Sequence, residues 1–171
     1  MNLVLVPITK TLAKAPFDCG YEDLNRYLRH YAFKNDRLSI GKTFVALAEG
    51  TAVAGYMTLS TAQVEAETMP EELKASLPRY PVPTVRIGKL AVDLRQQGRG
   101  VGKWLLKEAL AKAVEVSHHI GLYAVLVDAI DERAKGFYLK YGFVPFARQP
   151  MTLFLPLVAI EAAMQPPAKP L

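Results

Sequence analysis

Cysteine, histidine and tryptophan are scarce in this chain of 171 residues, and long apolar runs are missing. The single cysteine, Cys19, excludes an internal disulfide and favours a reducing compartment. No apolar stretch reaches the ~18 residues that a membrane span requires. The segment 1–8 is too short for a secretory signal and has no cationic lead. We therefore expect a cytoplasmic protein with no membrane association.

The three histidines, His30, His118 and His119, have no further ligands at the spacing of a metal site. The adjacent pair His118 and His119 falls at the end of a predicted helix, where the helix dipole favours a cation. A thiol nucleophile at Cys19 would need a base and an orienting third group, and the sequence indicates no such group. We therefore expect no metal site and no cysteine chemistry.

The length suits a single domain over residues 1–171, with a loose proline-containing tail at 165–171. The formal net charge of +5 and a pI near 9.3 are compatible with an anionic partner, such as a nucleic acid or a coenzyme. We expect no repeats and no interdomain linker.

Apolar periodicity predicts alternating strands and helices. Strands are expected at 3–8, 43–48, 53–64, 85–94, 122–129 and 152–157, with a hairpin turn at 49–50. Helices are expected around 24–31, over 100–117, and from an N-cap at Asp131 to near Gly142, with one helical turn within 71–77. This order predicts an α/β sandwich with a mixed sheet.

A glycine-rich stretch, Gln97-Gly98-Arg99-Gly100-Val101-Gly102, links the predicted strand 85–94 to the helix that follows. Glycines allow close approach of a ligand to the backbone, and the free N–H groups of a helix N-terminus bind pyrophosphate. The stretch is not a P-loop, because Gln97 and Trp104 stand where a glycine and a Ser or Thr are required. It also lacks the Gly-x-Gly-x-x-Gly spacing of a dinucleotide fold.

The remaining pattern, Gln97-x-x-Gly100-x-Gly102, resembles the coenzyme loop of the GNAT acetyltransferase superfamily. The sequence Phe137-Tyr138-x-x-x-Gly142-Phe143 is similar to a second motif of that family. The resemblance implies an α/β fold with a mixed, mostly antiparallel sheet, a splayed central strand and helices on both faces. It also implies acetyl-CoA as co-substrate.

The resemblance assigns roles to particular residues. Tyr138 would be the catalytic acid that protonates the leaving thiolate, with Tyr141 as the alternative, and no general base is evident. The main chain of Leu90, Ala91 and Val92 would pair with pantetheine, and one N–H there would meet the thioester oxygen. The pyrophosphate would be bound by Gln97, Gly98, Arg99, Gly100, Val101, Gly102 and Lys103.

A narrower resemblance covers residues 17–155. Phe17-x-Cys19-Gly20-x-x-x-Leu24-Asn25-x-Tyr27-Leu28, followed by Leu90-Ala91-Val92-Asp93, is similar to the GNAT toxins of toxin–antitoxin pairs. It implies acetylation of the α-amine of aminoacyl-tRNA, a block of translation, and a ribbon-helix-helix antitoxin as partner; a homodimer is compatible with it. The connection 69–83 differs, so the amino acid selected does not follow.

Seven basic residues are candidates for contact with the tRNA backbone. They are Arg79 and Arg86, which flank the proline-rich connection, and Arg26, Arg29, Lys34, Arg37 and Lys42. Two other functions stay open at this point: an acetyltransferase of a small-molecule or protein amine, and a binding module that keeps the fold without the chemistry.

Overall fold

The computed structural model describes residues 1–166 and divides into two compact units. Unit 1 comprises residues 1–60 and 87–109, and unit 2 comprises residues 61–86 and 110–171. Strands β3 (Ala52–Val64) and β4 (Val82–Val92) and helix α5 (Val101–Ser117) each contribute residues to both units. The prediction of one domain over residues 1–171 stays a prediction.

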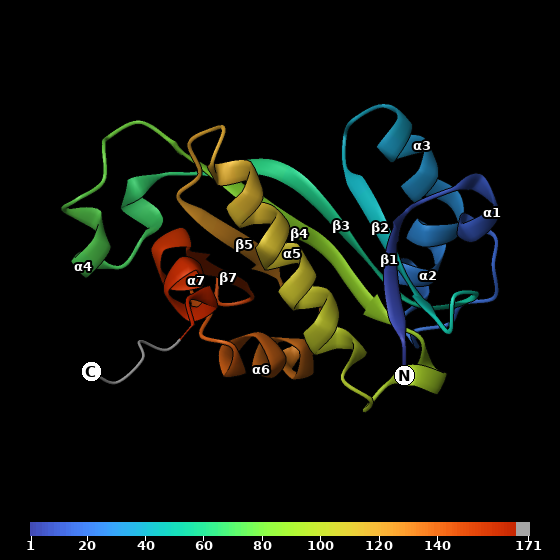
Figure 1. Cartoon of the computed structure of the whole chain (residues 1–171). Helices are drawn as coiled ribbons and strands as arrows, with labels where there is room; N and C mark the ends of the chain where they lie inside the picture. Colours follow the sequence, from blue (N-terminus) through green and yellow to red (C-terminus); the bar gives the residue numbers. More distant parts are fainter. Residues whose placement is uncertain (167–171) are drawn as a thin grey trace. The chain divides into compact units, whose positions relative to one another are not determined.

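Unit 1 combines an antiparallel meander with a broken helical segment (Figure 1). Its strands β1 (Leu3–Pro7) and β2 (Lys42–Ala48) pair antiparallel, and β2 pairs with β3 across a turn at Glu49 and Gly50. Both turn residues have positive φ, which confirms the predicted hairpin. The helical elements are α1 (Lys10–Ala13), α2 (Glu22–Tyr27), the π-helical turn η1 (Leu28–Ala32), α3 (Phe33–Arg37) and the 3-10 turn η3 (Leu94–Gln96).

The core of unit 1 is organised around Tyr56, which is fully buried in β3. Its ring lies between Phe17, 5.7 Å away in an edge contact, and Tyr27, 6.4 Å away and stacked. Its hydroxyl donates to the carbonyl of Leu24 at 2.7 Å. The polar end of a buried tyrosine is therefore satisfied while its ring anchors α2 on the sheet.

Unit 2 is built on β5 (Ala124–Asp128), which pairs antiparallel with β7 (Thr152–Pro156). The short edge strand β6 (Val144–Pro145) also pairs with β7. The other elements are η2 (Ala66–Thr68), α4 (Glu71–Lys74), α6 (Glu132–Lys140) and α7 (Leu157–Met164). The run Ala124–Val127 is almost wholly buried, as its continuous apolar sequence predicts.

Helix α6 begins and ends where the sequence indicates. The carboxylate of Asp131 accepts from the N–H of Ala134 at 2.8 Å, which confirms the N-cap. Gly142 follows the helix with φ +89°, and its N–H donates to the carbonyl of Leu139. The helix is therefore fixed at both ends by its own sequence.

The seven strands form one sheet in the order β1-β2-β3-β4-β5-β7-β6, so the predicted mixed, mostly antiparallel α/β architecture is confirmed. The segment α2–η1–α3 departs from the predicted simple helix, since its π-helical turn leaves Tyr31 half exposed. The apolar periodicity of the predicted helix 100–117 would place Val116 on the buried face of α5, but Val116 is exposed, and helix α7 has no counterpart among the predicted elements. The predicted loose tail at 165–171 falls mostly outside the described residues.

Candidate functional site

The glycine-rich stretch of unit 1 is an exposed loop between η3 and α5. Gly98 and Gly100 have φ of +75° and +84°, a region that L side chains rarely adopt. A Cβ at either position would meet no atom within 4 Å, so the space above both glycines is open. The loop therefore presents bare backbone to the surface.

Helix α5 begins directly after this loop. The N–H of Trp104 donates to the carbonyl of Gly100 at 3.0 Å, which is the first bond of the helix. The preceding N–H groups have no partner within the helix and carry its positive dipole end. Arg99 and Lys103 are exposed beside them. Open space, orphan N–H groups and two cations fit a pyrophosphate, so these residues suit the phosphates of acetyl-CoA.

Strand β4, which ends with Leu90, Ala91 and Val92, precedes η3 and the loop, and two contacts fix the main chain at its end. A Cβ on Gly55 would lie 2.6 Å from the carbonyl oxygen of Ala91, so only glycine allows this close packing of β3 on β4. The carbonyl of Val92 accepts from Nε2 of Gln97 at 3.0 Å. The Gln97 side chain, predicted to contact the coenzyme, is thus bonded within the protein.

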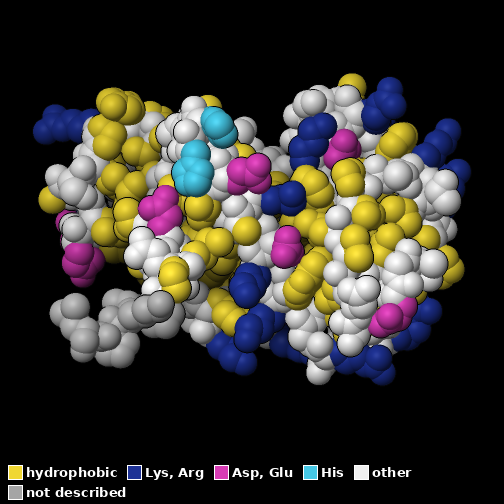
Figure 2. Space-filling view, in the orientation of Figure 1, with side chains coloured by type: hydrophobic (Ala, Val, Ile, Leu, Met, Phe, Trp, Pro, Cys, Tyr) yellow, Lys and Arg dark blue, Asp and Glu magenta, His cyan; other side chains and the backbone are white. Residues whose placement is uncertain are grey.

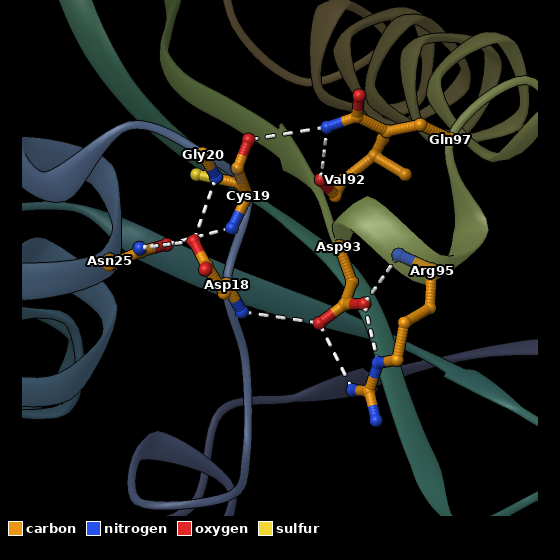
Figure 3. Close-up of polar contacts among 8 residues, drawn as sticks. All are labelled: Asp18, Cys19, Gly20, Asn25, Val92, Asp93, Arg95 and Gln97. Carbon is orange, nitrogen blue, oxygen red and sulfur yellow. Dashed lines mark hydrogen bonds and ion pairs between the residues drawn. The ribbon is translucent and has the colours of Figure 1, made fainter.

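A polar network that includes the buried Asp93 joins the loop to the segment before α2 (Figure 3). Asp93 is only 2% exposed and accepts from the N–H and the guanidinium of Arg95 and from the N–H of Asp18. Burial by itself raises the pKa of Asp93, but these hydrogen bonds outweigh it and the pKa lies below its ordinary value. Cys19 is buried, and burial raises the pKa of its thiol.

Tyr138 lies in unit 2 on α6 and is 6% exposed. Its ring makes edge contacts with Phe137 and Phe143, at 5.2 and 5.6 Å between centroids. Burial, followed by the negative charge of Asp128, raises the pKa of its phenol well above the ordinary value. The phenol is therefore protonated at neutral pH, and it is a weaker acid than an exposed tyrosine. The alternative, Tyr141, is less buried and packs on Phe137 at 5.1 Å.

The predicted tRNA-contacting residues fall into two groups. Three are ion-paired: Arg26 with Asp23 at 2.7 Å, Lys42 with Asp36 at 3.4 Å, and Arg86 with Asp128. The other four, Arg29, Lys34, Arg37 and Arg79, are exposed. Figure 2 shows Lys and Arg side chains gathered over α1 and α3 of unit 1.

Sequence reasoning gave no role to three polar residues that organise these regions, although it quoted two of them in the toxin motifs: Asn25, Asp93 and Asp128. Asn25 is 6% exposed, and its position inside an apolar helix pattern is the signal that could have identified it. Within residues 1–166, no three His, Cys, Asp or Glu side chains converge as a metal site would require. None of the helices described in that range has the length and apolarity needed to cross a membrane.

Comparison with known proteins adds to this geometry. Residues 7–143 match the model of the acetyltransferase (GNAT) family. The chain is 34% identical over 139 residues to the "tRNA-acetylating toxin" of Mycobacterium tuberculosis, an alignment that covers 81% of this chain and 82% of that protein.

Two solved structures share the fold. AtaT in complex with acetyl-methionyl-tRNAfMet has a TM-score of 0.86 and 28% identity, covering 96% of this chain and 100% of that one. A tyrosine-to-phenylalanine mutant of AtaT, bound to the C-terminus of the antitoxin AtaR and acetyl-CoA, has a TM-score of 0.80 and 27% identity, covering 96% and 99%.

Proposed function

The chain belongs to the acetyltransferase (GNAT) family, and from that premise we propose that it is a toxin that acetylates the α-amine of aminoacyl-tRNA. The observation that carries the proposal is the exposed loop with open space over Gly98 and Gly100 at the start of α5. The named functions of its relatives supply the substrate class. Acetylation would remove the nucleophile that forms the next peptide bond, and translation would stop.

Acetyl-CoA is the acetyl donor of this family and supplies a reactive thioester. The N–H groups of Gly100, Val101, Gly102 and Lys103 would bind its pyrophosphate, with Gly98 and Arg99 beside them. The side chains of Arg99 and Lys103 would add charge. Main-chain groups of Leu90, Ala91 and Val92 would hold the pantetheine arm. These assignments are proposals supported by the loop conformation.

Tyr138 is proposed as the acid that protonates the departing thiolate. Its ring packs against Phe137 and Phe143, and even the ordinary phenol pKa of about 10 keeps it protonated at neutral pH. A neutral phenol donates a proton only to a base formed during the reaction, and a thiolate is such a base. An α-amine has a pKa near 8, so about a tenth of it is neutral at pH 7, a far larger share than for a lysine amine of pKa about 10.4, and positioning is the main requirement.

The tRNA backbone would contact the exposed cations Arg29, Lys34, Arg37 and Arg79. Phosphates are bound by such side chains with little dependence on sequence, so these contacts would orient the acceptor end. Arg26, Lys42 and Arg86 are proposed as further contacts, and in the free protein each of them pairs with a carboxylate. We propose a cytoplasmic protein whose partner is an antitoxin of the ribbon-helix-helix type, and we propose a homodimer.

The test is an acetylation assay with purified protein, labelled acetyl-CoA and a pool of charged tRNAs. We expect label in the ester-linked aminoacyl group, with rates that fall as salt increases. The same assay with free amino acids and polyamines provides the comparison. Transfer to those amines without transfer to charged tRNA at any salt concentration would contradict the tRNA proposal and favour a small-amine acetyltransferase.

A further inference from the structure

The peptide groups of Cys19 are held from two sides by side-chain amides (Figure 3). Its N–H donates to Oδ1 of Asn25 on α2 at 2.9 Å, and its carbonyl accepts from Nε2 of Gln97 at 3.2 Å. Gln97 is the first residue of the glycine-rich stretch 97–102, which we call the glycine loop, and it lies 78 positions from Cys19 in sequence. Cys19 is therefore a junction between α2 and the loop, made through its main chain alone.

Each amide also makes a second bond that fixes its orientation. Nδ2 of Asn25 donates to Oδ1 of Asp18 at 2.8 Å, and the same carboxylate oxygen accepts from the N–H of Gly20. Nε2 of Gln97 donates to the carbonyl of Val92, the last residue of β4. Because Asn25 is almost fully buried, loss of either bond would leave a polar group without a partner in the interior.

The main chain of Asp18 adds two bonds to the same connection. Its N–H donates to Oδ2 of the buried Asp93 at 3.1 Å, and its carbonyl accepts from the N–H of Leu94 at 2.8 Å. Residues 18–20 are thus tied to α2 on one side and to the stretch 92–97 on the other. We use the name Cys19 clamp for residues 18–20 together with Asn25 and Gln97.

We propose that Asn25 and Gln97 are positioning residues: through the Cys19 clamp they hold the glycine loop in the conformation that binds acetyl-CoA. The inference rests on the proposed function, because it takes the loop to be the coenzyme site. Glycines with positive φ lose more conformational freedom on ordering than other residues, and the open space around Gly98 and Gly100 supplies no packing. Order in the loop must therefore come from its first residue, Gln97, and from the start of α5.

The first test replaces the donor of the clamp. Gln97→Met keeps the length of the side chain and removes its N–H groups. We expect the acetyl-CoA Kd, measured by calorimetry, to rise about 10-fold, the scale of one or two lost hydrogen bonds. The KM for aminoacyl-tRNA should not change, and amide hydrogen exchange at 98–100 should become faster. Gln63→Met, at an exposed position of β3, is the matched control.

The second test acts on the other side of Cys19. Asn25→Asp keeps an acceptor for the Cys19 N–H but loses the donor to Asp18 and adds a carboxylate beside another. We expect weaker acetyl-CoA binding here as well, and a double variant that loses less than the sum of the two single losses, because both residues act through one junction. If the losses of acetyl-CoA binding free energy were additive in the double variant, the proposal that both residues act through the Cys19 clamp would be overturned.

The outcomes separate this inference from the proposed function. A wild-type protein that does not bind acetyl-CoA would contradict the proposed function. A wild-type protein that binds acetyl-CoA, with Gln97→Met binding it equally well, would overturn the inference and leave the function intact. If Gln97→Met raised the KM for both substrates and lowered the Tm together, its role would be structural, and positioning would be rejected.

Discussion

Arg86 in β4 forms an ion pair with Asp128 at the end of β5, within unit 2. Thr152 at the start of β7 donates to the other oxygen of the same carboxylate at 2.9 Å. The Arg86 side chain is 34% exposed, so it is partly withdrawn from solvent. Arg86 and Arg79 flank the same connection in sequence, yet Arg79 is exposed and Arg86 is partly buried. We therefore expect substitutions of Arg79 and Arg86 to have different effects on tRNA binding and on stability.

Arg79→Glu should raise the KM for aminoacyl-tRNA and leave the acetyl-CoA Kd unchanged. Loss of one phosphate contact should also lower the slope of log K against log salt by about one. Arg86→Glu should instead lower the Tm, because it places a carboxylate beside Asp128. Salt titrations of acetylation and thermal melts check both. Arg148→Glu, at an exposed position of unit 2, is the control, and a control effect equal to that of Arg79→Glu would contradict a specific contact.

Tyr138→Phe should keep the fold and the acetyl-CoA Kd but reduce kcat by roughly 10²–10⁴-fold, the range for a lost general acid. The ring contacts with Phe137 and Phe143 survive this change, which removes only the hydroxyl. Single-turnover acetyl transfer is the measurement, with Tyr141→Phe as the comparison. Near wild-type turnover in Tyr138→Phe, with loss in Tyr141→Phe, would transfer the role to Tyr141.

Gly100→Val should weaken acetyl-CoA binding by more than about 10-fold, a loss of at least 1.4 kcal/mol. Valine disfavours φ of +84°, and its side chain would occupy the space proposed for pyrophosphate. Calorimetry on the folded variant is the measurement.

Gly50→Val is the matched control for that change. Gly50 has φ of +80° and open space around its Cβ position, but it lies in the β2–β3 turn. Both variants should lose similar stability from backbone strain, and only Gly100→Val should lose affinity. Equal acetyl-CoA affinities would mean that the loop is only a turn.

Acid should destabilise the protein partly through Asp93. Its pKa in the folded state is below the ordinary value, so the unfolded chain binds more protons as the pH falls below about 4. The stability that Asp93 contributes is present above that pH and is lost as the pH falls through the folded pKa. Asp93→Asn should therefore flatten the fall in unfolding free energy below about pH 4, measured by urea titration. Asp23→Asn, at a largely exposed carboxylate, is the matched control.

Local sequence rules predicted most of the elements because each has its own signal. The Asp131 N-cap, Gly142 after α6, and the Glu49-Gly50 turn depend on neighbours within four residues. The position of the glycine-rich stretch was likewise visible in the sequence, but the order of that loop depends on the distant contacts of Gln97. The elements and the place of the loop were therefore accessible from pattern.

The features that the sequence did not predict depend on contacts between residues distant in sequence. Tyr31 fits the i+7 position of an amphipathic helix, but the π-helical turn changes the phase and turns it outward. Gln97 was assigned to a ligand, and nothing near it in sequence indicates Cys19 as its partner. The pairing of Arg86 with Asp128 spans 42 positions and has no local signal.

The burial of Cys19 has a practical consequence for labelling. Cys19 is 2% exposed, its Sγ–H donates to the carbonyl of Tyr21 at 3.5 Å, and burial raises the pKa of the thiol, so little thiolate is available to react. The folded wild-type chain should thus behave toward maleimides as if it had no cysteine. A single cysteine introduced on the surface could carry a fluorophore without a background mutation, and α3, whose Lys34 and Arg37 are exposed, offers a site for reporting tRNA binding.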